Sequence, residues 1–224
     1  MLLLLTRSLC GLATSSIRIR HHHLPAIPPK PTHTSRGPGR ISMSSSATAA
    51  SFPPPQLKAA AEEVASLLKA RGETVCVAET AAGGLISSAL LATPGASKIY
   101  RGGLTLYTLE SRIAFAGWQQ RDIDEYDGPT PTLVEGLARN VRDKLKATYC
   151  IGESGTAGPT ASGDKPNRQP SYVALAVASQ DDSASKDLNT GLGNDRQANM
   201  VAFAVEALHL ARDFIEGKSN EGKL

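Results

Sequence analysis

The stretch from Val75 to Ile86, Val-Cys-Val-Ala-Glu-Thr-Ala-Ala-Gly-Gly-Leu-Ile, constrains the fold more than any other part of the chain. Its first residues, Val75 to Ala78, are apolar and small or β-branched, which is typical of a strand covered on both faces. From Thr80 the composition becomes helical, and the Thr80 hydroxyl is suited to cap that helix by accepting an amide hydrogen bond. The stretch therefore predicts a buried strand that runs directly into a helix.

Two glycines, Gly83 and Gly84, lie in the first turn of this predicted helix. Each costs about 1 kcal/mol of helix stability relative to alanine, so the pair indicates a close approach. The approaching group is either another part of the chain, in which case the glycines serve packing only, or a ligand. Ligands of open α/β sheets bind at the carboxyl ends of strands, and helix N-termini attract anions. We therefore place the active centre at the end of this strand.

Further helices and strands alternate along the chain. The hydrophobic pattern predicts helices over 57–70, 80–92, 109–115 and 130–146 and one that opens at 194–196, with strands over 74–78, 99–107, 148–153, 171–178 and 188–192. Segment 119–130 is predicted to be a polar turn, and Thr130 is predicted to cap the next helix with Pro131 at its first position. This alternation predicts an α/β fold with a central, mixed and largely parallel sheet.

The composition divides the chain into parts. Segment 1–42 contains six basic residues and no acidic one, segment 43–55 is rich in serine, alanine and proline, and 217–224 is a polar tail. We therefore expect a disordered transit peptide over 1–42, a linker over 43–55 and one domain over 56–216. The transit peptide predicts a mitochondrial protein. A secretory signal remains an alternative, and so does translation from Met43, which would leave the protein cytoplasmic.

The charge pattern argues against nucleic acid as a partner. The whole chain has a net charge of +3, but without the basic residues of 1–42 the rest carries 18 basic and 21 acidic residues, a net charge of −3. No basic stripe is visible, and aromatic residues make up only 4% of the chain. We also expect no membrane partner, because the apolar start is too short and broken to span a bilayer. Lys165 and Arg168 are predicted to be solvated loop charges.

The three cysteines do not indicate a metal or redox site. Cys10 lies in the leader, and Cys76 and Cys150 lie in predicted buried strands, where cysteine behaves as a small hydrophobic residue. No Cys-x-x-Cys pair is present. We therefore expect no metal and no disulfide framework.

Several motifs together resemble the CinA C-terminal domain family. They are Glu79-Thr-Ala-Ala-Gly-Gly-Leu-Ile, Pro94-Gly-Ala-Ser, Gly102-Gly-Leu-Thr-Leu-Tyr107, Ser154-Gly-Thr-Ala-Gly-Pro159 and Asp195-Arg196 before a helix. Their order and spacing match as well, and the resemblance covers about residues 56–215. It implies a three-layer α/β/α sandwich, a homodimer, and hydrolysis of the amide of nicotinamide mononucleotide to nicotinate mononucleotide and ammonia. It also implies that no cofactor is needed and that the partner is a small phosphorylated nucleotide.

The resemblance implies a set of site residues. Thr80 occupies the place of the family's serine nucleophile, and Arg112 occupies the place of a lysine. Arg112 cannot act as a general base, because a guanidinium stays protonated in proteins, but it can hold a phosphate. Glu79 or Tyr107 is then the candidate base, or Glu79 orients a water. The expected substrate-binding residues are Gly83, Gly84, Glu110, Ser154, Gly155, Thr156, Ala157, Gly158 and Arg196.

These departures leave two functions open. A threonine hydroxyl can attack an amide, although its methyl group restricts the approach. The first is therefore a nicotinamide mononucleotide deamidase with altered catalytic residues, or an amidohydrolase of another small phosphorylated substrate. The second is a binding or regulatory protein that keeps the nucleotide pocket without the chemistry.

Overall fold

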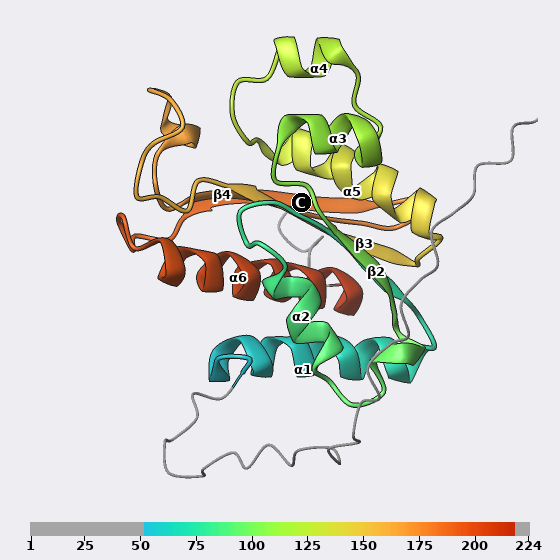
Figure 1. Cartoon of the computed structure of the whole chain (residues 1–224). Helices are drawn as coiled ribbons and strands as arrows, with labels where there is room; N and C mark the ends of the chain where they lie inside the picture. The colour runs from blue at the N-terminus through green and yellow to red at the C-terminus, as the bar shows by residue number, and fades with distance from the viewer. Residues whose placement is uncertain (1–51, 218–224) are drawn as a thin grey trace, which may run out of the picture. The chain divides into compact units, whose positions relative to one another are not determined.

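A mixed sheet forms the centre of the computed structural model, which describes residues 52–217 (Figure 1). Within these residues the sheet has the strand order β2-β1-β3-β4-β5. The strands are β1 (Val75–Glu79), β2 (Tyr100–Thr105), β3 (Tyr149–Gly155), β4 (Tyr172–Ala178) and β5 (Ser183–Asn189). Strand β1 pairs in parallel with β2 and β3, whereas β4 and β5 add on one side in antiparallel pairings.

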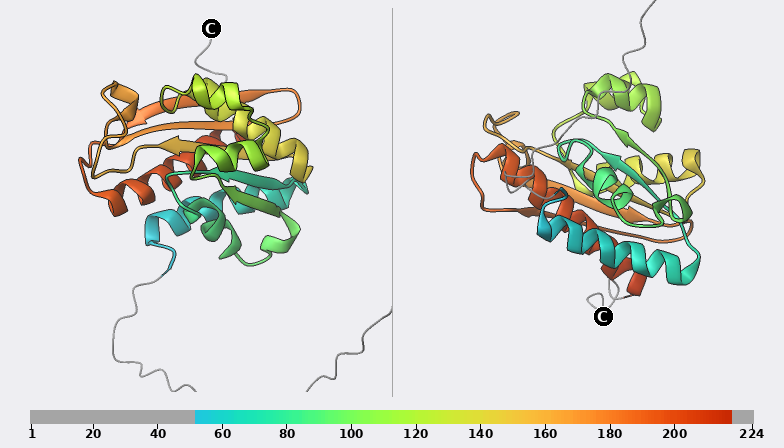
Figure 2. Two further views of the ribbon diagram at one scale, coloured as in Figure 1. Left: turned by 45° about the horizontal axis from the view of Figure 1, so that its top comes forward. Right: turned by 60° about the horizontal axis from the view of Figure 1, so that its bottom comes forward.

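Helices cover both faces of the sheet. They are α1 (Pro55–Arg71), α2 (Leu85–Leu91), α3 (Leu109–Ala116), α4 (Gln120–Asp124), α5 (Pro131–Leu145) and α6 (Arg196–Glu216), with 3-10 turns η1 (Ala96–Lys98) and η2 (Pro166–Arg168). Helix α5 packs against β1, β3 and β4 on one face, and α3 and α4 lie on that side. Helix α6 packs against β3 and β4 on the other face, with α1 alongside it and α2 against β1 (Figure 2). The predicted three-layer α/β/α sandwich is therefore confirmed.

The alternation of side chains along β1 produces this burial on both faces. Val75 and Val77 pack in the core beneath α1, α2 and α6, whereas Cys76 and Ala78 pack in the core beneath α5. All four side chains are fully buried, as expected for a central strand of a doubly covered sheet. Because Ala78 of β1 pairs with Gly152 of parallel β3, the carboxyl ends of these two strands meet at one edge of the sheet. The loops that follow them are therefore neighbours.

The helix boundaries follow the expected capping chemistry in most places. Thr130 accepts a hydrogen bond from the Leu133 amide, with Pro131 at the first position of α5. Asp195 caps α6 by accepting from the Ala198 amide. The predicted cap at Thr130 is confirmed, and the last helix begins within the expected 194–196. In both helices a side-chain oxygen at the first turn satisfies an otherwise unpaired amide.

Three local predictions are wrong. Thr80 does not cap α2, because the helix begins only at Leu85 after two residues with positive φ, Gly83 and Gly84. The edge strand lies at Ser183–Asn189 instead of 188–192. Segment 119–130 contains the short helix α4, closed by reciprocal hydrogen bonds between Gln119 and Asp122. Helix α1 begins at Pro55, next to the expected start of the domain at residue 56.

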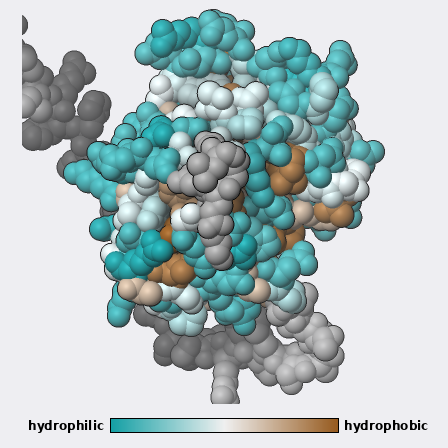
Figure 3. Space-filling model, turned by 180° about the vertical axis from the view of Figure 1, so that it is seen from behind, coloured by the Kyte–Doolittle hydropathy of each residue, from teal (hydrophilic) through white to brown (hydrophobic). Residues whose placement is uncertain are grey.

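The expected transit peptide and most of the expected linker and tail lie outside the described residues. Seen from behind, the described surface is mostly hydrophilic with separate apolar areas (Figure 3). Among residues 52–217, no helix is both long and apolar enough to cross a membrane.

Candidate active site

A cavity of about 500 Å³ opens at the edge of the sheet where β1 and β3 end. Its wall comes from the loops after β1 and β3, from helices α3 and α4, and from the start of α6. The predicted site residues that line it are Thr80, Tyr107, Arg112, Ser154, Gly155, Thr156, Ala157, Gly158 and Arg196. The predicted site residues absent from its lining are Glu79, Gly83, Gly84 and Glu110.

Thr80 and Ser154 form a hydroxyl pair in this cavity. The Thr80 hydroxyl donates a hydrogen bond to the Ser154 Oγ over 3.2 Å, and both residues are almost fully buried. The two residues come from the ends of β1 and β3, which the parallel pairing brings together. The Thr80 hydroxyl is therefore buried at the cavity wall and donates its hydrogen to the Ser154 hydroxyl.

Arg112 extends this chain of polar groups. Its Nη2 lies 3.5 Å from the Ser154 Oγ, while the side chain is 3% exposed. The guanidinium lies over the rings of Trp118 and Tyr126, with its carbon 4.9 Å and 5.1 Å from the two ring centroids. These aromatic faces stabilise the charge through cation–π attraction. A permanent positive charge therefore lies next to the hydroxyl pair.

Glu79 faces away from the cavity, because it precedes Thr80 and adjacent side chains of a strand point to opposite faces. Its carboxylate is fully buried and accepts hydrogen bonds from the amides of Ile86 and Ser87, at 3.1 Å each. The Ser87 hydroxyl also donates to it, at 2.5 Å. Glu79 thus fixes the start of α2 in this structure and has no contact with the hydroxyl pair.

The glycine pair after β1 serves the turn and the packing of α6. Gly83 and Gly84 have φ values of +67° and +98°, which favour glycine. A Cβ on Gly83 would lie 2.9 Å from the end of the Met200 side chain. The close approach expected from the sequence is therefore made by another part of the chain. Glu110 lies on the exposed surface of α3, away from the cavity lining.

Glu153 is the main residue that the sequence analysis missed. Its side chain is fully buried, and its Oε2 accepts hydrogen bonds from the amides of Thr80 at 2.9 Å and Ala82 at 3.0 Å. The carboxylate thereby fixes the backbone at Thr80 and Ala82, on both sides of Ala81. It thus holds the loop that carries the Thr80 hydroxyl. The signal in the sequence was a single acidic residue at the end of an otherwise apolar strand, next to Ser154.

The surroundings of Glu153 shift its protonation. Burial raises the pKa of Glu153 from 4.5 to about 7, and the charge of Glu79 adds to this rise. The amide hydrogen bonds from Ala82 and Thr80 and the charge of Arg112 act in the opposite direction. The second carboxylate oxygen, Oε1, has no hydrogen-bond partner among the described residues. Glu153 therefore exchanges a proton near neutral pH, directly beneath the loop that carries Thr80.

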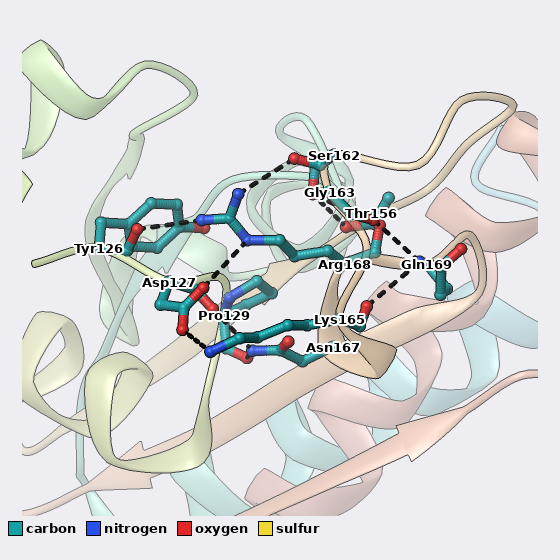
Figure 4. Close-up of polar contacts among 10 residues, drawn as sticks. All are labelled: Tyr126, Asp127, Pro129, Thr156, Ser162, Gly163, Lys165, Asn167, Arg168 and Gln169. Atoms are coloured by element: carbon teal, nitrogen blue, oxygen red, sulfur yellow. Dashed lines mark hydrogen bonds and ion pairs between the residues drawn. The ribbon is translucent and has the colours of Figure 1, made fainter.

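A loop after β3 covers one side of the cavity. Arg168 donates to the carbonyl oxygens of Ser162 at 3.1 Å and Tyr126 at 3.0 Å, and Lys165 pairs with Asp127 (Figure 4). Asn167 adds a hydrogen bond to the Asp127 carbonyl. Arg168 was predicted to be a solvated loop charge, and this is wrong, because it lines the cavity and ties the loop to the segment after α4.

Asp127→Asn is expected to loosen this loop without unfolding the domain. The Lys165 ammonium holds the pKa of Asp127 below its usual value, so the carboxylate is charged and pairs with both Lys165 and Arg168. Exposed ion pairs add little to global stability, so the melting temperature should barely change. Amide hydrogen exchange of 160–168 should become faster. Asp164→Asn, a neighbouring exposed carboxylate, is the matched control. Unchanged exchange in the Asp127 variant would contradict this assignment.

The cavity is cationic. Its lining contains three arginines, Arg112, Arg168 and Arg196, and no aspartate or glutamate. Arg196 donates to the Gly158 carbonyl over 2.7 Å and, through Nη2, to the Tyr107 hydroxyl over 3.4 Å. Among residues 52–217, no group of three or more acidic, histidine or cysteine side chains is placed to hold a metal ion. The cavity therefore suits a small organic anion.

Together, the fold and site define an α/β sandwich protein with buried hydroxyls and arginines at the carboxyl edge of its sheet. The chain belongs to the CinA C-terminal domain family, whose sequence profile matches residues 57–215. It is 31% identical over 157 residues to a CinA-like protein of Frankia casuarinae, covering 70% of this chain and 35% of the relative. A CinA-like protein of Desulforapulum autotrophicum is 31% identical over 151 residues, covering 67% and 35%. The chain thus spans about a third of these relatives' length.

Solved structures of bacterial CinA-superfamily and competence/damage-inducible proteins share the fold. One from Klebsiella pneumoniae has a TM-score of 0.66 at 19% identity, covering 72% of this chain and 98% of that one. One from Agrobacterium tumefaciens has a TM-score of 0.65 at 22% identity, covering 71% and 95%. At these identities the likeness concerns the fold alone.

Proposed function

We propose that this protein hydrolyses the carboxamide of nicotinamide mononucleotide to give nicotinate mononucleotide and ammonia. The observation that carries the proposal is the hydroxyl pair of Thr80 and Ser154 beside the Arg112 guanidinium, in a cavity lined by arginines. An amide hydrolase of a phosphorylated substrate needs a nucleophile, donors for the developing oxyanion and a cationic site for the phosphate. Membership of the CinA C-terminal domain family supports the same reaction.

The arrangement suggests how the substrate lies. Its carboxamide belongs beside Thr80, because that hydroxyl is the candidate nucleophile. Its phosphate then belongs at the other side of the cavity, near Arg196 and Arg168 and the loop through Gly158. Arginine is well suited to this task, since its planar fork matches phosphate oxygens.

The chemistry follows in two steps. The Thr80 oxygen attacks the amide carbon, and the C–N bond breaks as ammonia leaves with the threonine proton. The Ser154 hydroxyl, which accepts the hydrogen bond of Thr80, is placed to pass that proton on. Ala81, which follows the nucleophile, and Arg112 both line the cavity, and the Ala81 amide and the Arg112 guanidinium are the candidate donors for the developing oxyanion. Water then hydrolyses the acyl-threonine ester to release the acid.

The test is ammonia release from nicotinamide mononucleotide by the full chain. Thr80→Ala should lower the rate by roughly a hundredfold or more, because the nucleophile is lost. Thr80→Ser keeps the hydroxyl and should retain activity. Thr132→Ala, an exposed threonine on α5, is the matched control and should not change the rate. An unchanged rate in Thr80→Ala would move the chemistry to a directly activated water.

A second candidate function is nucleotide binding without turnover. The observation that favours it is the chemistry of Arg112, which stays protonated and so cannot serve as a general base. Such a protein would be stabilised against heat by nicotinamide mononucleotide and would release no ammonia. The same assay, combined with a melting curve, separates this function from the first.

A further inference from the structure

Arg112 is an incompletely paired cation in the wall of the cavity. The side chain is 3% exposed, and its Nε and Nη1 have no hydrogen-bond partner among the described residues. Within residues 52–217, its Nη2 makes one hydrogen bond, the long contact of 3.5 Å to the Ser154 Oγ. Glu153 is near enough to feel its charge, but that carboxylate is bonded to the amides of Thr80 and Ala82.

The other two arginines of the cavity are better satisfied. Arg196 donates to a backbone carbonyl and to a tyrosine hydroxyl. Arg168 donates to two carbonyls, and its Nε, which has no hydrogen bond among the described residues, lies 3.8 Å from an oxygen of the Asp127 carboxylate. Burial of a guanidinium is costly unless an anion or enough acceptors replace its water. The rings of Trp118 and Tyr126 compensate for the charge but supply no acceptor for the two free nitrogens. Arg112 therefore lines the cavity as a buried cation whose donors are not all used within the described residues.

The position of Arg112 decides which end of the ligand it meets. Its Nη2 and the Thr80 hydroxyl both contact the Ser154 Oγ. A group held by Arg112 is thus the group that reacts with Thr80, while the phosphate lies nearer Arg196. Before the reaction this group is a neutral carboxamide, which offers one oxygen. After the reaction it is a carboxylate, which offers two oxygens and a negative charge.

We propose that Arg112 makes this site selective for the acid form of the nucleotide, so that nicotinate mononucleotide binds more tightly than nicotinamide mononucleotide. This inference rests on the proposed function for the identity of the ligand. Selectivity for the acid means that the site binds the reaction product more tightly than the substrate. The acid inhibits turnover at concentrations below those at which the amide saturates the enzyme.

Isothermal titration of the full chain tests the proposal. Thr80→Ala is used as the background, so that the amide is not consumed during the measurement. The acid should bind at least about tenfold more tightly than the amide, which corresponds to about 1.4 kcal/mol. Adding Arg112→Gln should weaken binding of the acid by a similar factor and leave the affinity for the amide nearly unchanged. Because the first comparison needs no change at Arg112, misfolding of the second variant would not remove the test.

Ribose 5-phosphate separates the two anionic ends of the ligand. Its affinity should be insensitive to Arg112→Gln and should fall in Arg196→Gln.

If Arg112→Gln lowers the affinities for ribose 5-phosphate and for the acid by the same factor, the phosphate binds at Arg112 and the proposal is overturned. Equal affinities for acid and amide would overturn it as well, even if the wild-type protein releases ammonia. Acid selectivity without ammonia release would overturn the proposed reaction and leave the role of Arg112 standing. Binding of neither nucleotide would overturn both.

Discussion

Gly155→Ala is expected to lower the free energy of unfolding by about 3 kcal/mol, which is a large fraction of the stability of a domain this size. A Cβ at Gly155 would lie 2.6 Å from the Tyr172 carbonyl oxygen and 3.1 Å from the Val173 Cα. Both atoms belong to the backbone of β4, which pairs with β3 at this point and cannot yield without losing sheet hydrogen bonds. A third contact, at 3.0 Å, would be with the Phe203 ring. The methyl group would therefore push the end of β3 away from the sheet.

Gly136→Ala is the control for this change. Gly136 lies in the interior of α5, and, apart from its chain neighbours and the backbone of its own helix, a Cβ there would meet no described atom within 4 Å. The same substitution should therefore stabilise the protein by about 1 kcal/mol, because alanine is the better helix former. Urea unfolding of both variants gives the two free energies. A Gly155 variant as stable as the wild type would show that β3 and β4 can separate at their ends without cost.

Much of the fold could be predicted, because the apolar residues of the buried helices and strands recur at the spacing of a helix or a strand. The apolar run Val75–Ala78 and the capping residue Thr130 indicated their elements correctly, and the last helix begins within the expected 194–196. The meeting of Thr80 and Ser154 also followed from the sequence, because both come at the ends of predicted strands. What the sequence did not supply was the turn after β1, where two residues of positive φ delay the helix to Leu85.

The candidate site was predicted less well, and the reason lies in the alternation of side chains. Glu79 and Thr80 are adjacent at the end of one strand, so their side chains point to opposite faces and cannot share a cavity. The same rule places Glu153 and Ser154 on opposite faces. Position at a strand end alone does not separate the two faces, so it groups residues that point in opposite directions. Applied strictly, the alternation rule would have excluded Glu79 from the cavity.

The contacts of the loop after β3 lay beyond sequence reasoning for a different reason. Arg168 and Lys165 lie about 40 positions from Asp127 and Tyr126 and meet them only through the packing of two loops. No local pattern encodes such a pairing, since a charged residue in a polar loop is usually solvated.

Two buried glutamates, Glu79 and Glu153, lie on the same face of neighbouring parallel strands, one residue beyond the pair of Ala78 and Gly152. Each is held by amides, but Glu153 also has an oxygen that lacks a hydrogen-bond partner in the part of the chain that the structure describes. A charge on Glu153 is therefore opposed by burial and by the neighbouring carboxylate, as its raised pKa reflects. The folded protein binds a proton at Glu153 more strongly than the unfolded chain does.

The expected result is that Glu153→Gln stabilises the protein at alkaline pH and has little effect at acidic pH. Between the unfolded pKa of 4.5 and the folded pKa of about 7, the folded state holds the extra proton, so wild-type stability falls as pH rises through this window. Glutamine mimics the protonated side chain, keeping an acceptor for the amides of Thr80 and Ala82. The difference in unfolding free energy should therefore grow from near zero at pH 4.5 to a plateau above pH 7. Its size is on the order of 3 kcal/mol.

Urea unfolding of both proteins at pH 5 and pH 8.5 measures this difference. Glu125→Gln, which changes an exposed carboxylate, serves as the control and should show no such growth. A difference that stays constant between the two pH values would show that Glu153 does not exchange its proton in this window. A Glu153→Gln variant that is less stable than the wild type at pH 8.5 would give the opposite result. It would mean that the hydrogen bonds from the amides of Thr80 and Ala82 stabilise the charged carboxylate by more free energy than its burial costs. In that case Glu153 would anchor the nucleophile loop as an anion.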